Sequence, residues 1–217
     1  MQKQSTKTLY DYWNSLRGSR SAPDRRDIDP TRIRGALANT FILELNEQRE
    51  FDFRLAGSHL CTAYSRELKG RSFTRLWHPK DRDALETLIR AVTEDHAVAL
   101  VTFQGVTAIS SRLAVECILL PVRHNGSTES RLLGAMTVID EPYWFGVQPV
   151  VEQRITGLRL IWPDDNSLAE MARDIAAIVP QDVVYARAGA PEPMSATVFG
   201  RRARRYAHLS VIDGGRI

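Results

Sequence analysis

The chain has 217 residues, of which 43% are hydrophobic, 25% charged and 8% aromatic. These fractions are typical of a globular protein and exclude a wholly disordered chain. No apolar run approaches the roughly 18–20 residues that a membrane span needs, and the N-terminus lacks the apolar core of a signal peptide, so we expect a cytoplasmic protein. Two cysteines, Cys61 and Cys117, fit neither a disulfide framework nor a zinc site, which also indicates a reducing compartment.

The small net charge of +3 is concentrated near the C-terminus. From Pro180 to the end, six arginines stand against three acidic residues, an excess equal to the whole net charge. Residues 1–179 therefore sum to zero and lack the overall basic field that is typical of nucleic-acid-binding domains. We do not expect a nucleic acid as the partner.

The N-terminal third of the chain predicts two helices and a hairpin. The apolar residues of the first helix recur at helical spacing; they are Leu9, Tyr12, Trp13 and Leu16. Gly18 ends this helix, and a second, short one is predicted from Asp29–Pro30, because aspartate suits the N-cap and proline the first helical position. A β-branched and apolar run predicts a strand at 40–45, and alternating apolar and polar residues predict one at 51–55, joined to the first by a polar turn.

The rest of the body predicts short helical turns over 58–76, a longer helix that begins at His78–Pro79, and three strands at 97–106, 112–122 and 131–140. The second of these strands is apolar on both faces, which indicates a central position. This order predicts an α+β fold, a five-stranded antiparallel sheet with helices on one face.

Beyond residue 140 the pattern weakens. Residues 154–162 predict a further strand, and Leu168, Met171, Ala172 and Ile175 predict a short amphipathic helix. Residues 180–205 are rich in Ala, Pro, Gly and Arg, a composition typical of a flexible tail.

Three stretches of the chain carry motifs in a characteristic order. Phe-Arg-Leu-Ala-Gly-Ser-His-Leu at 53–60 is similar to the segment of the PAS sensor domain family where the second strand runs through a glycine into the first helix. Leu-Lys-Gly-Arg-Ser-Phe-Thr-Arg-Leu at 68–76 is similar to the turn that follows, and His-Pro-Lys-Asp-Arg at 78–82 to the entry of the long PAS helix. The N-terminal helix with its proline-containing linker further resembles the solitary PAS proteins common in alphaproteobacteria.

The resemblance covers residues 5–145 and implies a sensing or docking module without chemistry of its own. We expect an N-terminal helical segment at 1–36, a PAS domain at 37–145, a C-terminal extension at 146–179 and a basic flexible tail at 180–217. No helix-turn-helix pattern, phosphate loop or kinase glycine box accompanies these segments. The expected function is therefore signalling in trans, through a protein partner such as a sensor histidine kinase.

A PAS domain encloses a pocket, and eleven residues of this chain belong to the elements that surround it. They are Leu55, Leu60, Tyr64, Phe73, Trp77, Leu85, Ile89, Val101, Phe103, Ile118 and Met136. An apolar lining of this kind suits a small hydrophobic ligand. The alternative, which we prefer, is that the same side chains fill a dry core. We predict no cofactor.

Few residues have the type and spacing that are typical of a catalytic, cofactor-binding or metal-binding site. His78 is a candidate haem ligand, but its place beside a proline favours a role at the start of the helix. His96 suits a helix C-terminus, and His59 could face the pocket. Cys61 lacks the Asn-Cys-Arg-Phe-Leu-Gln context of a flavin photosensor and is expected to be a buried small side chain. With no nucleophile motif and no metal-ligand spacing, we expect neither an enzyme nor a metal site.

Two features predict partners. The helical stripe Leu9, Tyr12, Trp13 and Leu16 could pack on its own sheet or pair with a second copy, and we prefer the homodimer. Arg201, Arg202, Arg204 and Arg205 could bind phosphate in a nucleotide or nucleic acid. Only the first half of a cyclic-dinucleotide motif of the PilZ kind is present, so a solvated basic tail is the preferred interpretation.

Overall fold

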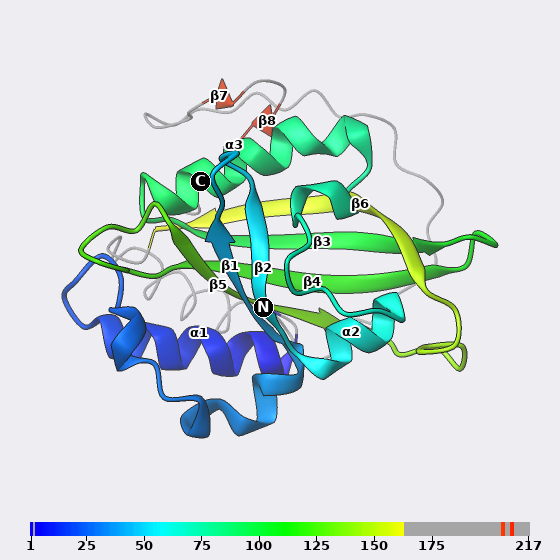
Figure 1. Ribbon diagram of the computed structural model, residues 1–217, viewed down its shortest axis with the longest axis horizontal. Helices are drawn as coiled ribbons and strands as arrows, with labels where there is room; N and C mark the ends of the chain where they lie inside the picture. Colours follow the sequence, from blue (N-terminus) through cyan, green and yellow to red (C-terminus); the bar gives the residue numbers. More distant parts are fainter. Residues whose placement is uncertain (2, 163–204, 207–208, 211–217) are drawn as a thin grey trace, which may run out of the picture.

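Six strands form one sheet in the order β2-β1-β5-β4-β3-β6, and every neighbouring pair is antiparallel (Figure 1). The computed structural model describes residues 1, 3–162, 205–206 and 209–210. The strands are β1 (Thr40–Leu45), β2 (Phe51–Ala56), β3 (Val98–Thr107), β4 (Arg112–Pro121), β5 (Arg131–Val138) and β6 (Val150–Ile161), and a short pair β7 (Arg205–Tyr206) and β8 (Leu209–Ser210) follows.

Helices cover both faces of this sheet, with α1 and α3 on opposite sides (Figure 1). The α-helices are α1 (Gln4–Arg17), α2 (Ser58–Tyr64) and α3 (Arg82–Thr93). The 3-10 helices are η1 (Arg25–Asp27), η2 (Pro30–Asn39), η3 (Thr74–Leu76) and η4 (Pro79–Asp81). The N-terminal layer, which we define as residues 1–39, packs on one face, and α2 and α3 pack on the other.

Strand β4 shows why two layers form. Its alternate residues Leu113, Val115, Cys117 and Leu119 belong to the core beneath α2 and α3. Ile118 and Leu120 point the other way, into the core beneath α1. Successive side chains of a strand face opposite sides of the sheet, so a strand that is apolar at nearly every position needs cover on both.

Aromatic rings dominate the core on the α3 side. Phe41, Phe53 and Phe73 lie with their ring centroids 5.6–5.7 Å apart. Trp77 extends the cluster, at 5.8 Å from Phe73 and 4.9 Å from Phe103. Edge-to-face and offset packing at these distances adds to the free energy gained by burying the rings.

Helix α1 is held on its own sheet. Leu9 and Trp13 are 0% exposed, and the indole Nε1 of Trp13 donates a hydrogen bond of 2.8 Å to the carbonyl of Pro121. Tyr12 and Leu16 lie half-buried at the margin of this contact. Leu9 and Trp13 of the predicted dimer stripe are therefore buried within their own chain, because the sheet face beneath them is apolar. Tyr12 and Leu16 keep part of their surface, and a homodimer through this helix stays a prediction.

The segment that connects α2 to α3 is hydrogen-bonded to both edge strands of the sheet, β2 and β6. Residues 70–73 pair with β2, where the amide of Gly70 donates to Phe53 O at 2.8 Å and that of Phe73 to Phe51 O at 2.8 Å. Farther along, the amide of His78 donates to Gln153 O of β6 at 2.8 Å. Asp81 Oδ2 accepts a bond of 3.0 Å from the amide of Ile155. The segment between α2 and α3 thus touches both margins of the sheet.

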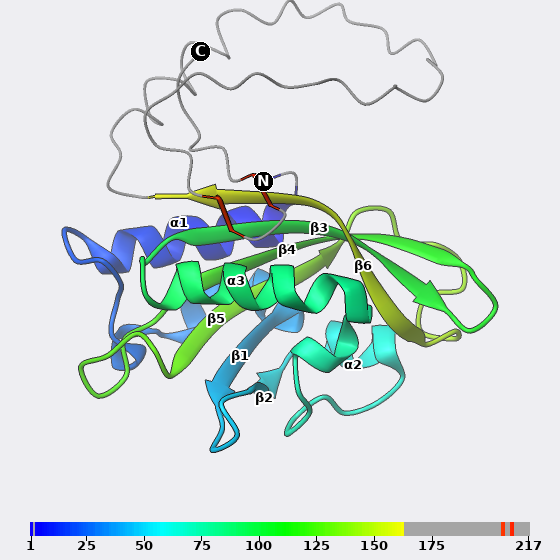
Figure 2. The same ribbon diagram turned by 90° about the horizontal axis from the view of Figure 1, so that it is seen from above.

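The predicted α+β fold is confirmed, with two differences. The sheet has six strands, because β6 pairs with β3 from Val150 onward and lies along the outer margin (Figure 2). The N-terminal layer covers the second face, whereas the prediction placed helices on one. The predicted helix near Leu168–Ile175 and the predicted tail at 180–217 lie largely outside the described residues. Within the described part of the chain, no helix is long and apolar enough to cross a membrane.

Candidate functional site

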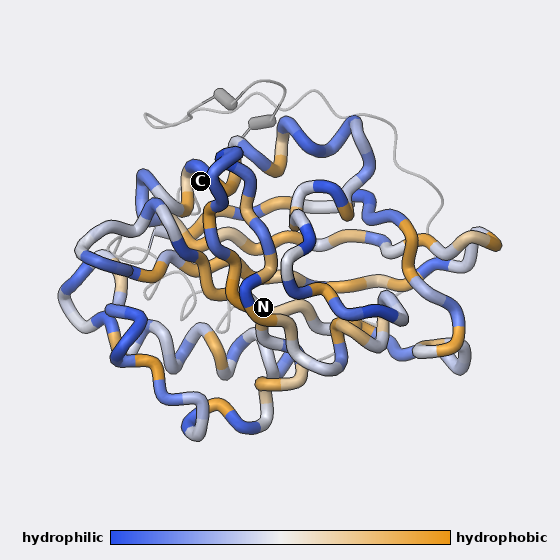
Figure 3. Tube along the Cα trace, in the orientation of Figure 1, coloured by the Kyte–Doolittle hydropathy of each residue, from blue (hydrophilic) through white to orange (hydrophobic). Residues whose placement is uncertain are grey.

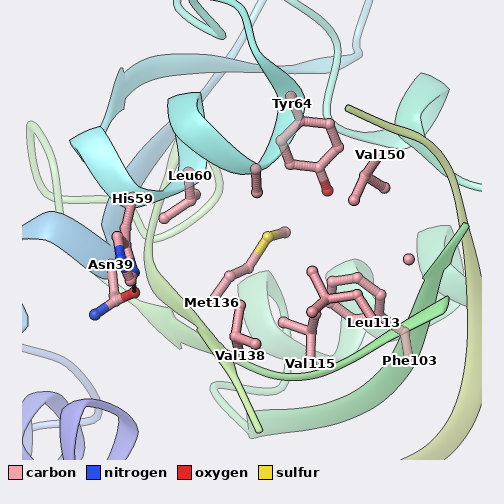
Figure 4. A pocket seen from close by; sticks show the side chains of 12 residues that line it. Asn39, His59, Leu60, Tyr64, Phe103, Leu113, Val115, Met136, Val138 and Val150 are labelled. Atoms are coloured by element: carbon pink, nitrogen blue, oxygen red, sulfur yellow. Dashed lines mark hydrogen bonds between the residues drawn. The ribbon is translucent and has the colours of Figure 1, made fainter. Parts of the chain in front are cut away.

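A small cavity lies between α2 and the sheet, where a PAS pocket is expected (Figure 4). Its lining comes from η2, α2, β3, β4, β5 and β6, and consists of Asn39, His59, Leu60, Ala63, Tyr64, Phe103, Gly105, Leu113, Val115, Met136, Val138 and Val150. The volume open to the centres of water-sized molecules is about 20 Å³. That is close to the space one water molecule requires. Side chains of the protein itself therefore fill nearly all of this core.

Four of the eleven predicted lining residues contact the cavity, namely Leu60, Tyr64, Phe103 and Met136. Five more are buried in the same core without reaching the cavity, namely Phe73, Trp77, Leu85, Ile89 and Val101. The two remaining predictions are wrong. Ile118 faces α1 on the opposite side of β4, and Leu55 is 48% exposed.

A β-bulge explains the position of Leu55. Strand β2 pairs Leu55 with Ile42 but Phe53 with Leu43, so Arg54 is an extra residue in the ladder. The insertion reverses the side on which the following residue lies. Leu55 therefore shares a face with Ile42, which packs toward α1, whereas Phe53 remains in the core beneath α3.

One end of the cavity is polar. The ring Nδ1 of His59 lies 3.1 Å from Asn39 Oδ1, and its Nε2 lies 3.6 Å from Glu141 Oε2. The ring centroids of His59 and Phe145 are 5.2 Å apart. This histidine thus joins the end of η2, the start of α2 and the β5–β6 connection. Figure 4 shows Asn39 and His59 side by side at this end, away from Tyr64.

Gly57 brings these elements together. A Cβ atom at this position would lie 2.3 Å from the carbonyl oxygen of Ala38, a distance that no side chain tolerates. The amide of Gly57 also donates to Thr40 O at 2.8 Å. Because this residue has no side chain, α2 begins against the end of η2, where Asn39 and His59 meet.

The far end of the cavity holds a buried polar contact. The side-chain amide of Gln153, on β6, donates a hydrogen bond to the hydroxyl of Tyr64. Burial raises the pKa of Tyr64, so its hydroxyl stays protonated. Among the described residues, Gln153 Oε1 and the indole Nε1 of Trp77 are buried and have no hydrogen-bond partner. The contact links α2 to the sixth strand, and no pattern in the sequence predicts it.

The other candidate residues have structural roles. The side chain of His78 accepts a hydrogen bond of 3.2 Å from the amide of Lys80, which is the helix-start role we preferred. His96 Nε2 lies 3.2 Å from Thr128 Oγ1. Cys61 is half-buried, and its thiol lies 3.7 Å from Glu67 Oε1, so it is not the buried small side chain that we expected. In the described part of the chain, no group of three or more His, Cys, Asp or Glu side chains is placed to hold a metal ion.

A second hollow lies on the surface between the β1–β2 hairpin and residues 66–76. It measures about 610 Å³ and is lined by Asn46, Gln48, Glu50, Asp52, Arg66, Gly70, Arg71, Ser72, Arg75 and Leu76. Arg75 Nη2 crosses it to Glu50 Oε1 at 3.2 Å. Apart from Gly70 and Leu76, its lining residues have polar or charged side chains, unlike those of a typical small-molecule pocket.

The family model described as PAS domain matches residues 1–137, and the chain belongs to this family. The resemblance expected from the motifs is confirmed. Membership indicates a sensory or regulatory role. A search of curated proteins finds no match.

The fold is also similar to solved structures. One, titled as a flavin-analogue study of the light-oxygen-voltage (LOV) domain mechanism, is 17% identical, with a TM-score of 0.42 over 52% of this chain and 85% of that one. A Rhodobacter sphaeroides LOV protein is 13% identical, with a TM-score of 0.40 over 49% and 61%. A PAS domain from Colwellia psychrerythraea is 16% identical, with a TM-score of 0.37 over 51% and 98%.

A flavin does not fit the cavity as the structure has it. Organic ligands of that size occupy pockets of about 300–1,000 Å³, whereas this cavity has about 20 Å³. Cys61 does not line it and lies beside Glu67.

Proposed function

We propose that this PAS protein is a non-catalytic regulator that acts in trans by binding another signalling protein, such as a sensor histidine kinase. The observation that carries the proposal is the filled interior of the PAS fold, whose cavity of about 20 Å³ leaves little room for a substrate. Both faces of the sheet are covered by the chain's own helices. Contact with other molecules then falls to the outer surfaces of those helices and loops.

The titratable groups near the cavity support a role without chemistry. Cys117 is 0% exposed, and burial raises the pKa of its thiol. A protonated thiol is a poor nucleophile. The pKa of Tyr64 is likewise raised by burial, so its hydroxyl is a poor base at neutral pH. Among the described residues, His59 contacts a carboxylate and an amide but no hydroxyl or thiol that it could activate.

A second candidate function is reception of a small molecule by the cavity. One observation favours it: the apolar lining has a polar group at each end, the His59–Asn39 pair and the Tyr64 hydroxyl. Met136 lies between them, and its flexible thioether can move aside at little energetic cost. A ligand of a few carbon atoms with one polar end is the chemistry that this lining fits.

The phosphate-binding alternative rests on Arg201, Arg202, Arg204 and Arg205, whose side chains lie outside the described residues. It stays a prediction from the sequence, as does the cytoplasmic location.

The two candidate functions are tested with one pair of variants. Met136→Phe fills the cavity, and Met136→Leu keeps its volume. Wild type and both variants serve as bait for capture of signalling proteins, and the autophosphorylation rate of each captured kinase is then measured with and without the protein. The regulator proposal expects the same partner and the same rate change for all three. A partner that Met136→Phe alone loses, together with a small molecule that native mass spectrometry finds only on wild type and Met136→Leu, would establish the receptor instead.

A further inference from the structure

The N-terminal layer is the basic part of the described chain. Residues 1–39 contain eight lysines and arginines but four aspartates, whereas residues 40–162 contain fourteen basic and fifteen acidic residues. This layer lies outside the sheet, on the face opposite α2 and α3. Figure 3 shows hydrophilic residues along much of the segment between α1 and β1. The net charge of zero over residues 1–179 therefore conceals an uneven distribution.

Four arginines of this layer, Arg25, Arg26, Arg32 and Arg34, make up what we call the arginine strip together with Arg123 of the β4–β5 connection. The amide of Arg25 donates to Arg123 O at 2.9 Å, and that of Arg123 to Pro23 O at 2.9 Å, which places Arg123 beside η1. Arg32 and Arg34 flank Ile33, whose side chain is 2% exposed and anchors η2 on the core. The side chains of Arg26, Arg32 and Arg34 are thereby left exposed.

The aspartates among these arginines are engaged within the segment. Asp24 Oδ1 accepts the amide of Arg26 at 3.0 Å. Asp27 Oδ2 pairs with Arg20 Nη2 at 3.0 Å. Asp29 accepts both the amide and the hydroxyl of Thr31 at 2.9 Å, and these hydrogen bonds, with the charges of Arg32 and Arg34, hold its pKa below the usual range.

The guanidinium groups of the strip, by contrast, have no carboxylate partner among the described residues. The acidic groups serve as helix caps or pair with Arg20. The side chains of Arg26, Arg32 and Arg34 are exposed, and those of Arg25 and Arg123 are half-buried. A surface of this kind complements a negatively charged one, and guanidinium is the cation best suited to bind carboxylates through paired hydrogen bonds.

We propose that the arginine strip is the surface on which this protein binds an acidic segment of its partner protein. The inference rests on the proposed function and specifies that the partner presents acidic side chains. Two other polyanions fit less well. Duplex DNA carries one negative charge per ~1.7 Å of its axis. So dense an array of phosphates would be repelled by the carboxylates of Asp24, Asp27 and Asp29 at the same surface. A bilayer would be favoured by exposed apolar side chains, but only Leu37, at 36% exposure, is a large exposed apolar residue of this layer.

The test compares two triple variants of the full chain. The strip variant is Arg26→Gln, Arg32→Gln and Arg34→Gln. The matched control, Arg66→Gln, Arg90→Gln and Arg159→Gln, removes the same charge at exposed arginines elsewhere. The probe is a labelled 12-residue peptide of alternating Glu and Ser, with a Gln and Ser peptide as the uncharged counterpart. Fluorescence anisotropy at 50 mM salt should show binding of the acidic peptide that the strip variant weakens about tenfold and the control by less than twofold.

Three results would overturn the inference. The first is that wild type does not bind the acidic peptide. The second is that the strip variant and the control variant lose the same amount of peptide affinity. The third is that duplex DNA, or vesicles containing phosphatidylserine, bind to the strip more tightly than the acidic peptide does. The partner-capture experiment separates this inference from the proposed function. If the strip variant captures the same partner as wild type, the inference about the strip is wrong and the proposed regulatory function is supported. If the strip binds the acidic peptide but no variant captures a signalling partner, the proposed regulatory function is wrong and the inference about the strip is supported.

Discussion

The backbone amide of Lys3 donates a hydrogen bond of 3.2 Å to the carboxylate of Glu116, 113 residues away in the chain. Glu116 is 1% exposed and lies on the central strand β4. Helix α1 has no side-chain cap of its own and no acidic residue in its first turn. The sheet therefore supplies the negative group that the N-terminus of this helix needs.

Replacing Glu116 by Ala should loosen α1 from the sheet. The substitution removes the acceptor for Lys3 and is expected to lower the free energy of unfolding by about 1–3 kcal/mol. Hydrogen exchange of the α1 amides, followed by mass spectrometry, should quicken more than that of α3. Asp11→Asn, on the exposed side of α1, is the control. Unchanged exchange in Glu116→Ala would show that the carboxylate does not hold the helix.

Gly57 and Gly35 offer a matched pair of glycine substitutions. Gly57→Ala places a Cβ atom 2.3 Å from Ala38 O and should destabilise the protein by about 1–3 kcal/mol. Gly35→Ala meets nothing within 4 Å and should change stability by less than about 1 kcal/mol, in the stabilising direction. Urea unfolding monitored by tryptophan fluorescence compares them. Equal effects would mean that the approach of α2 to η2 is not tight.

The contact between Tyr64 and Gln153 is suited to a double-mutant cycle. Tyr64→Phe leaves the buried amide of Gln153 without this acceptor and should destabilise by about 1–3 kcal/mol. Adding Gln153→Leu removes the second polar group, and the double variant should recover much of the loss. The free energies of unfolding of wild type, the two single variants and the double variant give the coupling energy between the two side chains. Additive losses would indicate that the two side chains do not interact.

The ion pair of Glu44 and Arg131 predicts a pH dependence. Arg131 donates to Glu44 Oε1 from Nη2 at 2.6 Å and from Nε at 3.2 Å, which lowers the pKa of Glu44 from 4.5. A carboxyl whose pKa is lower in the folded state stabilises the fold above the unfolded pKa, and this stabilisation is lost as the pH falls through the folded value. The stability difference between wild type and Glu44→Gln should therefore be present at pH 6 and shrink as the pH falls below 4.5. A difference that does not change with pH would contradict the assignment.

Trp13→Ala tests whether α1 belongs to its own chain. It removes a side chain that is 0% exposed and should destabilise by about 3–5 kcal/mol, whereas Tyr143→Ala, at a side chain 97% exposed, should not. The mass in sedimentation equilibrium should be the same for wild type and Trp13→Ala. A wild-type dimer that Trp13→Ala converts to a folded monomer would restore the stripe as a dimer contact.

Sequence periodicity predicted the strands and the long helix well, because most of them bury one apolar face. It could not predict the faces of Leu55 and Ile118. The bulge at Arg54 carries no glycine or proline to mark it, and β4 is apolar on both faces. The family motifs located the elements around the cavity but not its volume, which depends on side-chain packing.

The polar groups of the site were harder to predict than its apolar ones. Asn39, Glu141 and Gln153 come from three segments that meet only in the folded chain. His59, by contrast, lies within the 53–60 motif, two residues after the glycine of the strand-to-helix turn. A buried glutamine on an otherwise ordinary strand pattern gives no local signal of its partner.

The connection between α2 and α3 has a consequence for the behaviour of the protein at high concentration. It occupies backbone groups of β2 at Phe51 and Phe53 and of β6 at Gln153 and Ile155. Exposed edge strands are the places where sheets of separate molecules join and aggregate. Because a single segment shields part of both edges, its release after a protease cut within residues 66–80 would expose both edge strands to pairing with other molecules.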